Sequence, residues 1–311
     1  MSELDEFTAQ LNAGADNKPA GQPPANISPE QLKAMQEQQA ATKALLEKEL
    51  EQTPLKGKVD LKWYGHSGVK ISWKDTKDVQ RNVYINICSD NPNCPAEDKK
   101  NPPNDADLAL VTQGQFEHSM HAPFLMQAGK KENRQIVCTS EVGLFFQMFK
   151  NIPAPVFAKM QPGGTKDFEY CKITMVHSEK ISSCPGPNGV QIPGGNACGF
   201  VVTIPNVEGA TIYHCGDTSI FSDMKLINDL YEPNIVLLPI GDQFSMNIRE
   251  GAHALKNFLT NAKIVVPLHI GKGPAEEFDF DGFKKQCEDL GVEGVTFIHP
   301  KDFFGGKAVL E

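Results

Sequence analysis

A long series of short apolar runs, rich in β-branched residues and separated by turn residues, extends from Val59 to Ile298. This pattern is typical of β-strands. The predicted strands cover 59–64, 68–73, 82–88, 107–112, 135–139, 169–176, 199–204, 210–215, 234–240, 263–268 and 294–298. The predicted helices cover 222–231, 248–259 and 279–290, between the later strands. A run of strands followed by strands alternating with helices predicts an α/β protein, with two mixed sheets packed together and helices outside them.

The first 57 residues differ from the rest of the chain. They contain one aromatic residue and many Gln, Ala, Glu and Lys, so residues 1–27 are predicted to be flexible. Ser28 and Pro29 mark a helix start, and the good helix formers that follow predict one long helix at about 28–53. The apolar residues of this helix do not form one continuous face along it. The helix is therefore either a solvated surface helix or an arm that docks on a protein partner or on the chain's own body, and we expect the second domain to cover 58–311.

Charge and composition limit the classes of function. The net charge is −9, which argues against a broad basic surface for nucleic acid. No apolar run approaches the roughly 20 residues of a membrane span, and the N-terminus lacks the apolar segment of a signal peptide. The eight cysteines form no C-x-x-C pair, so a structural zinc knuckle is not predicted. We expect a cytoplasmic protein with reduced thiols, no nucleic-acid or membrane partner, and room for a small-molecule ligand.

Polar side chains that could bind a metal follow several of the predicted strands. Strand ends in sheet proteins hold functional loops in place, and imidazole and carboxylate groups together are the ligands of zinc and similar ions. The candidates are Gln113, Gln115, Glu117 and His118 after 107–112, His177 after 169–176, Asp217 after 210–215, His269 after 263–268, and His66 in the turn after 59–64. His214, inside a strand, is interpreted as a packing residue.

The order of these segments resembles the metallo-β-lactamase superfamily, whose signature T-H-x-H-x-D-H precedes a further His, an Asp and a last His. Within it, the chain is similar to the bacterial metal-dependent hydrolase branch that includes the ascorbate-phosphate lactonase-like proteins. The resemblance covers most of residues 59–300. It rests on the segments "WYGHSGVKI", "GGNACGFVVTI", "IYHCGDTSIFSDMKLI", "LLPIGDQFSMN" and "VPLHIGKGP". It implies a four-layer αββα sandwich with a metal site at one edge.

The same resemblance implies two metal positions. The first would use residues 113, 115 and 177, and the second would use 117, 118 and 269, with Asp217 bridging them. Such pairs typically hold a hydroxide that attacks the substrate at neutral pH. In this chain the stretch "TQGQFEH" carries Gln113 and Gln115 in place of both leading histidines. A glutamine amide is a poor substitute for imidazole on zinc, so the first metal position is predicted to be lost.

The second position is less altered. Glu117, His118, Asp217 and His269 could supply four ligands to one Zn²⁺ or similar divalent ion, although Glu117 replaces an aspartate. Glutamate is one methylene longer than aspartate, so its carboxylate oxygen is displaced by about 1 Å. A displacement of this size can lower the activity of a catalytic site about 100-fold. His66 is expected to support the ligands from behind, and His177 to serve as an acid or base.

Two functional hypotheses follow. The main one is a pseudoenzyme that has lost its two-metal hydrolase site, binds no metal, and acts as a binding or assembly component. In that case Gln113 and Gln115 would fill the pocket with an amide network, and Asp217 would tend to take up a proton if no cation lay beside it. The alternative is a single-metal hydrolase of a small phosphorylated or lactone-type metabolite.

Overall fold

The computed structural model describes residues 58–129, 131–205, 207, 210–270, 278–303 and 307–310. The predicted arm at 1–57, with its helix at about 28–53, lies outside the described residues. The strands are β1 (Val59–Trp63), β2 (Val69–Lys74), β3 (Gln80–Ile85), β4 (Leu108–Leu110), β5 (Gln135–Thr139), β6 (Phe157–Met160), β7 (Thr165–Asp167), β8 (Lys172–Pro185), β9 (Gln191–Thr203), β10 (Thr211–His214), β11 (Ile235–Pro239), β12 (Ile264–Leu268), β13 (Thr296–Phe297) and β14 (Lys307–Leu310). The helices are α3 (Ala96–Lys100), α4 (Phe116–Ser119), α5 (Ala122–Ala128), α6 (Ser140–Lys150), α7 (Met224–Tyr231), α8 (Ile248–Asn257) and α9 (Phe280–Asp289).

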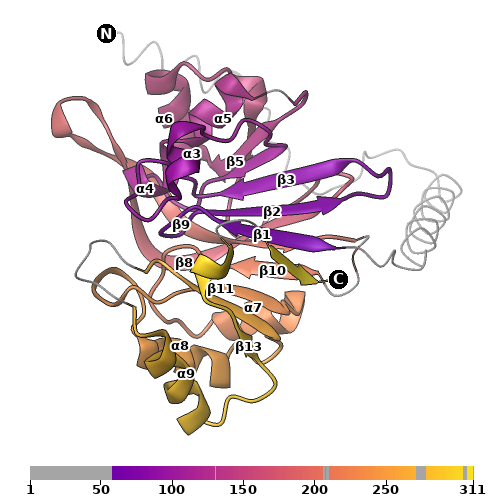
Figure 1. Ribbon diagram of the computed structural model, residues 1–311. Coiled ribbons are helices and arrows are strands. Elements are labelled where there is room, and N and C mark those ends of the chain that lie inside the picture. The colour runs from indigo at the N-terminus through magenta and orange to yellow at the C-terminus, as the bar shows by residue number, and fades with distance from the viewer. Residues whose placement is uncertain are drawn as a thin grey trace, which may run out of the picture. The chain divides into compact units, whose positions relative to one another are not determined.

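Within the described ranges, the strands form two seven-stranded sheets (Figure 1). The first has the order β14-β1-β2-β3-β4-β5-β6, and the second has the order β13-β12-β11-β10-β9-β8-β7. Strands β3 to β6 are parallel in the first sheet, as are β10 to β13 in the second. Parallel strands end at a common edge of their sheet, and this edge is where ligands bind in open α/β sheets.

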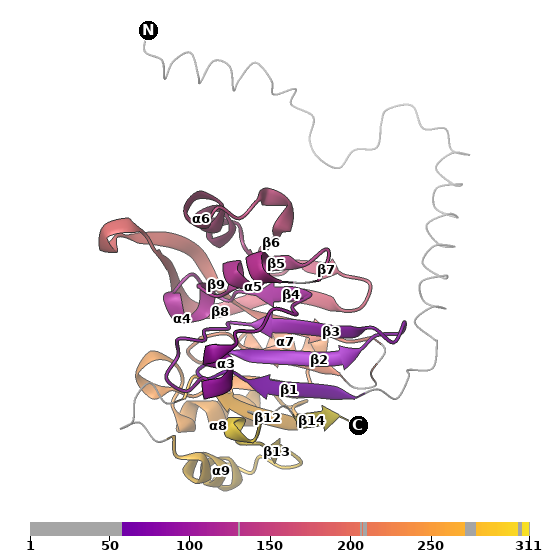
Figure 2. The same cartoon turned by 45° about the horizontal axis from the view of Figure 1, so that its top comes forward.

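Three layers of apolar side chains hold the domain together. The largest lies between the sheets and includes Trp63, Ile71, Phe200 and Leu237. Its members alternate with less buried residues along the strands: in β1, Val59, Leu61 and Trp63 are buried, and Asp60 and Lys62 between them are partly exposed. A second cluster joins the other face of the second sheet to α7, α8 and α9, and a third joins the first sheet to α5 and α6. Figures 1 and 2 show the helices on the two outer faces, which confirms the predicted αββα sandwich.

The sequence predicted eleven of these strands and the three later helices, but not the strands β6, β7 and β14 or the helices α3 to α6. Helix α6 reads "SEVGLFFQMFK", and its three phenylalanines are as typical of strands as of helices. In the structure Thr139 caps the helix by accepting a hydrogen bond from the Val142 amide, and Phe145 and Phe146 are buried against the first sheet. Packing on the sheet therefore decided the conformation of a segment whose local preferences were ambiguous.

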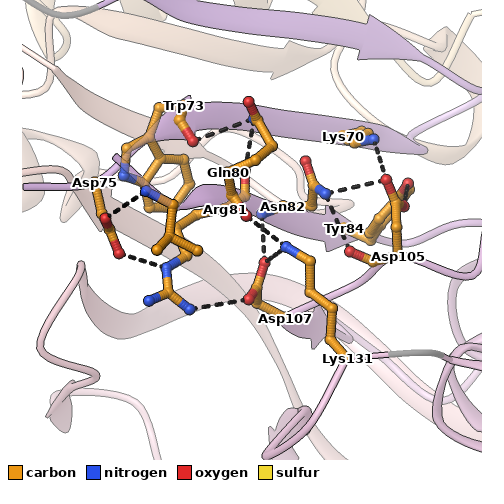
Figure 3. A network of polar contacts seen from close by, with 11 residues as sticks. Lys70, Trp73, Asp75, Gln80, Arg81, Asn82, Tyr84, Asp105, Asp107 and Lys131 are labelled. Carbon is orange, nitrogen blue, oxygen red and sulfur yellow. Dashed lines mark hydrogen bonds and ion pairs between the residues drawn. The ribbon is translucent and has the colours of Figure 1, made fainter. Parts of the chain in front are cut away.

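A network of charged groups joins the beginnings of β3 and β4 (Figure 3). The Arg81 guanidinium donates to Asp75 at 2.7 Å and to Asp107 at 3.2 Å, and it lies over the Tyr170 ring at 4.3 Å. Asp107 also accepts from the Asn82 amide at 2.7 Å and from Lys131 at 2.5 Å. Because Asn86 and Gln113 follow the other ends of these strands, the network closes the end of the sheet opposite to the candidate site.

Strands β8 and β9 continue beyond the second sheet as a long hairpin that projects from the domain (Figures 1 and 2). Residues 183–196 form the outer part of this hairpin. Ile181 is 80% exposed and Val190 is 60% exposed. Among the described residues, no helix has the length and apolar character needed to cross a membrane.

Candidate metal centre

Three buried histidines meet at the edge where the parallel strands end. One ring nitrogen of each of His66, His118 and His269 lies within 4.8 Å of the corresponding atoms of the other two. The rings of His66 and His269 have centroids 3.8 Å apart, and those of His118 and His269 are 5.7 Å apart. Each histidine is no more than 2% exposed. Three imidazoles at such distances, shielded from water, are a ligand set for one divalent ion.

The main chain fixes two of these histidines. His66 lies in the turn between β1 and β2, and His269 directly follows β12. Both have positive φ angles, 51° and 61°, a region that non-glycine residues rarely adopt. The His269 amide donates to the His66 carbonyl at 3.0 Å, and Trp63 Nε1 donates to the same carbonyl at 3.0 Å. Strained residues held by several hydrogen bonds are concentrated at functional sites.

A hydrogen bond orients the third histidine. His118 lies on the short helix α4, and its Nδ1 is 3.0 Å from Ser67 Oγ. Ser67 Oγ also accepts from the Asn86 amide at 3.3 Å, and Asn86 in turn joins Thr112 at 2.8 Å. With Nδ1 directed at Ser67, the other ring nitrogen of His118 faces the cluster. A partner on the remote nitrogen is how proteins orient histidines that bind metals.

Asp217 lies beside the rings of His118 and His269, three residues after the end of β10, and is 2% exposed. Its Oδ1 is 3.4 Å from His269 Nε2, and its Oδ2 is 3.9 Å from His118 Nε2 and 3.1 Å from Lys180 Nζ. Burial by itself would raise the pKa of Asp217, but the contact with His269 and the charges of His118 and Lys180 outweigh it and hold the pKa well below its ordinary value. Asp217 is therefore ionised, chiefly through His269 and with smaller contributions from His118 and Lys180, so the proton uptake considered for a carboxyl group without a cationic partner does not apply.

Gln113 occupies part of the predicted first metal position. Its side chain is buried, and Nε2 donates to Asp217 Oδ2 at 2.9 Å. The sequence suggested an amide network made by Gln113 and Gln115, and this hydrogen bond is the Gln113 part of it. Gln115 is the residue before α4 and makes no capping hydrogen bond with its side chain. Of the two glutamines, Gln113 is thus the one that contacts the carboxylate.

Gly114, between the two glutamines, contacts the β8–β9 hairpin. A Cβ atom at this position would lie 2.4 Å from Cys184 Sγ and 2.9 Å from the Ser183 carbonyl oxygen. The Gly114 amide donates to Ser182 Oγ at 3.0 Å, so the backbone is also fixed from the same side. Only glycine fits this approach without displacing the hairpin.

We therefore expect Gly114→Ala to lower the free energy of unfolding by about 1–3 kcal/mol, since overpacking displaces backbone. Urea unfolding of both proteins measures the change. Removing the Sγ atom in Gly114→Ala/Cys184→Ala should restore part of the loss. An unchanged midpoint in Gly114→Ala would show that the hairpin does not press on this loop.

His214, interpreted from the sequence as a packing residue, also joins two parts of the site. Its Nε2 donates to the Ser67 carbonyl at 2.9 Å, and its Nδ1 accepts from the Gly216 amide at 3.1 Å. Both ring nitrogens are thus satisfied only when the ring is neutral. Complete burial accordingly lowers the pKa of His214 to about 4.

This pKa predicts a pH dependence of stability. A histidine in the unfolded chain has a pKa of about 6.5, so between pH 6.5 and 4 the unfolded state binds a proton that the folded state excludes. Stability therefore falls as the pH falls through this window, by about 2 kcal/mol at pH 5. Urea unfolding at pH 7 and pH 5 should show a smaller loss for His214→Gln than for the wild type. The exposed His253→Gln serves as the control and should match the wild type.

Two predicted residues are not members of the three-histidine cluster. Glu117 is half-buried on α4 and lines a cleft that His66 also lines. The His177 side chain is 45% exposed, with Nε2 3.2 Å from Glu179 Oε2 and its ring against Phe221. A register shift between His177 and Ile181 in the β8–β9 pairing changes which residues of β8 face the site. The histidine expected as outer support, His66, instead lies within the cluster.

A cleft of about 260 Å³ opens beside His66. Its walls come from the segment after β3 and from α4, and the lining residues are His66, Cys88, Asp90, Asn91, Pro92, Phe116 and Glu117. The cleft has room for a small organic molecule, and His66 connects it to the histidine cluster. Two carboxylates in the wall give it an acidic character.

The buried polar atoms of the cluster fit a divalent ion. Among the described residues, both ring nitrogens of His269 and the Oδ1 atom of Asp217 are buried without a hydrogen bond. Buried polar groups without partners are uncommon and costly, and a missing ion is one explanation for them. Nitrogen and carboxylate donors are also the ligands that zinc and similar ions prefer.

An αββα sandwich with histidines and an aspartate at one strand edge defines a metallo-hydrolase type of protein. A model of the beta-lactamase superfamily domain matches residues 60–269. A UPF0173 metal-dependent hydrolase of Koribacter versatilis is 34% identical over 232 residues, covering 73% of this chain and 91% of the relative. The chain therefore belongs to the beta-lactamase superfamily and, within it, to the UPF0173 metal-dependent hydrolases.

Further comparisons agree with this assignment. A UPF0173 metal-dependent hydrolase of Methanosarcina barkeri is 34% identical over 247 residues, covering 78% of this chain and 96% of the relative. The solved structure of Igni18, a metallo hydrolase from the archaeon Ignicoccus hospitalis, matches with a TM-score of 0.62. It is 23% identical and covers 81% of this chain and 97% of its own, so it supports the fold alone.

Proposed function

We propose that this protein is a metal-dependent hydrolase that uses one divalent ion, held by His66, His118 and His269. The observation that carries the proposal is the convergence of these three buried imidazoles beside an ionised aspartate. Relatives that match most of the chain are named metal-dependent hydrolases. The main prediction from the sequence, a pseudoenzyme without a site, receives no support from them, and the alternative of a single-metal hydrolase is favoured.

When bound, a divalent ion would supply a Lewis acid and lower the pKa of a water molecule toward neutrality. The protein's own groups would prepare the site for it. Ser67 holds the His118 ring through Nδ1, and the main-chain contact between His66 and His269 fixes the other two rings. Asp217 Oδ1 faces His269 without a hydrogen bond and can accept one from the attacking water. With its lowered pKa, Asp217 would orient that water rather than store its proton.

The cleft beside His66 favours one of the two predicted substrate classes. The described residues that line it include no lysine or arginine to pair with a phosphate group, whereas a neutral lactone or ester needs no such partner. Phe116 and Pro92 add apolar surface for the body of a small substrate. We therefore favour a small, uncharged lactone- or ester-type substrate.

Metal content is the direct test of the proposed function. Protein purified without a chelator should contain about one ion per chain by mass spectrometry, and chelated protein should bind one Zn²⁺ in a calorimetric titration. A panel of lactones and esters, with phosphorylated analogues as the comparison, then tests hydrolysis by the loaded protein. Absence of tight binding for Zn²⁺, Mn²⁺ and Fe²⁺ alike would refute the proposal.

A cytoplasmic location fits this proposal. All eight cysteines are free and buried in the described part of the chain. Burial raises the pKa of Cys94 to about 11 and that of Cys138 to about 12, so these thiols stay protonated and unreactive. Unpaired thiols in such number are typical of proteins kept in reducing compartments.

A further inference from the structure

Lys180 is a partly buried cation that the sequence did not single out. It lies on β8, its side chain is 21% exposed, and Nζ is 3.1 Å from Asp217 Oδ2. The same ammonium donates to the Phe244 carbonyl and lies over the Phe244 ring at 6.0 Å. The Asp217 carboxylate and the Phe244 carbonyl thus both hold the Lys180 ammonium beside the site.

The two oxygens of Asp217 have different surroundings. Oδ2 receives the Gln113 amide at 2.9 Å and the Lys180 ammonium at 3.1 Å. Oδ1 has no hydrogen bond and lies 3.4 Å from His269. One oxygen is thus committed to protein groups, and the other remains directed at the metal-binding side. A carboxylate that bridged two ions through its two oxygens would instead need Oδ2 free of these protein groups.

We propose that Lys180 is a built-in cation that holds Asp217 and takes the place of a second metal ion, so that the site accepts one ion only. The inference rests on the proposed function in assuming that the histidine cluster binds an ion. Lys180 acts through Asp217 and is a positioning residue. A fixed ammonium supplies positive charge at Oδ2 without a set of metal ligands, which explains why Gln113 can stand where the family resemblance implies a histidine.

Three consequences follow for the protein. In the metal-free protein, removal of Lys180 leaves the buried Asp217 carboxylate without its lysine partner. The folded state of the variant should therefore be less stable than that of the wild type. The histidine cluster should bind Zn²⁺ more tightly, by about tenfold, since a positive charge near the ion has been removed. The Zn²⁺ should therefore raise the melting temperature of the variant more than that of the wild type.

The experiment compares wild type, Lys180→Met, Lys180→Arg and Lys172→Met as full-length, chelated proteins. Lys172 is the matched control, a lysine on the same strand that is 45% exposed and 3.9 Å from Asp167. Melting temperatures are measured with and without Zn²⁺, and calorimetry gives the number of ions and the affinity. In the metal-free state, Lys180→Met should melt about 5–10 °C below the wild type. Lys172→Met and Lys180→Arg should stay close to the wild type.

The double variant Lys180→Met/Asp217→Asn tests whether Lys180→Met lowers stability through Asp217 or through a general folding defect. Without the carboxylate charge, the loss of Lys180 should cost almost nothing relative to Asp217→Asn alone. A reduced Zn²⁺ affinity in Lys180→Met would indicate a merely structural role and overturn the inference. Two ions bound by the wild type would also overturn it, as would equal melting temperatures for Lys180→Met and Lys172→Met.

A failure of the proposed function can be distinguished from a failure of the inference about Lys180. If the wild type binds no Zn²⁺, Mn²⁺ or Fe²⁺, the hydrolase proposal is refuted and, with it, the replacement of a second ion. The difference between Lys180→Met and Lys172→Met in the metal-free state then decides whether Lys180 holds Asp217. The two results can therefore be told apart.

Discussion

Replacing His118 by alanine should weaken Zn²⁺ binding by roughly a hundredfold or more. Partners of metal ligands alone contribute about 10–100-fold to affinity, so loss of a ligand should cost at least the upper end of that range. Calorimetric titration of the chelated proteins measures the change. On the same basis, Ser67→Ala, which removes the partner of His118 Nδ1, should weaken binding by about tenfold.

The exposed His253→Ala is the control for stray binding by surface histidines and should bind Zn²⁺ like the wild type. The circular dichroism spectrum of His118→Ala should also match the wild type, since α4 has only four residues. If His118→Ala retained the full affinity, the ion would have to be bound elsewhere and the histidine cluster would not be the metal centre.

The second large effect is expected at the opposite end of the first sheet. Arg81→Met would leave Asp75 and Asp107, whose side chains are 4% and 6% exposed, without their shared guanidinium. Removing one partner of a buried ion pair is strongly destabilising, and the 22% exposure of the Arg81 side chain moderates the loss. The free energy of unfolding should fall by about 2–3 kcal/mol, measured by urea denaturation.

Arg81→Lys is the matched comparison. A lysine keeps the charge but cannot donate to both carboxylates in the planar geometry of a guanidinium or stack in the same way on Tyr170, so it should recover only part of the loss. Zn²⁺ binding should be unchanged in both variants because the network lies at the far ends of β3 and β4. Full stability of Arg81→Met would mean that solvent replaces the arginine at little cost.

The fold was predictable from the sequence because its strands carry their own local signals. Val59–Trp63 and Val69–Lys74 alternate between buried and less buried residues, and the parallel strands β11 and β12 are almost continuously apolar. The order of motifs then selected the αββα sandwich. Helix α6 escaped prediction because phenylalanine-rich segments suit either conformation until the sheet that covers them is known.

The candidate site was predictable only in part. The positions of His118, Asp217 and His269 after strands brought them together as expected, and the Gln113 amide contacts the carboxylate. The position of Lys180 could not be read from the sequence, because the register shift in β8 interrupts the alternation that would relate it to His177. The available signal was that Lys180 stands two residues from the buried Ser178, so that it could face the interior. Its role becomes clear only in the structure, where it contacts Asp217.

The hydrogen bond between His269 and the His66 carbonyl has a consequence for how the centre is built during synthesis. It joins the first turn of the domain to the end of its twelfth strand, and β1 pairs further on with β14. A ribosome-bound chain that has not yet emerged as far as His269 lacks both this ligand and the contact that fixes His66. If the cluster binds an ion as proposed, the complete set of ligands therefore forms only after His269 has emerged, and chains truncated before it should not compete for the ion.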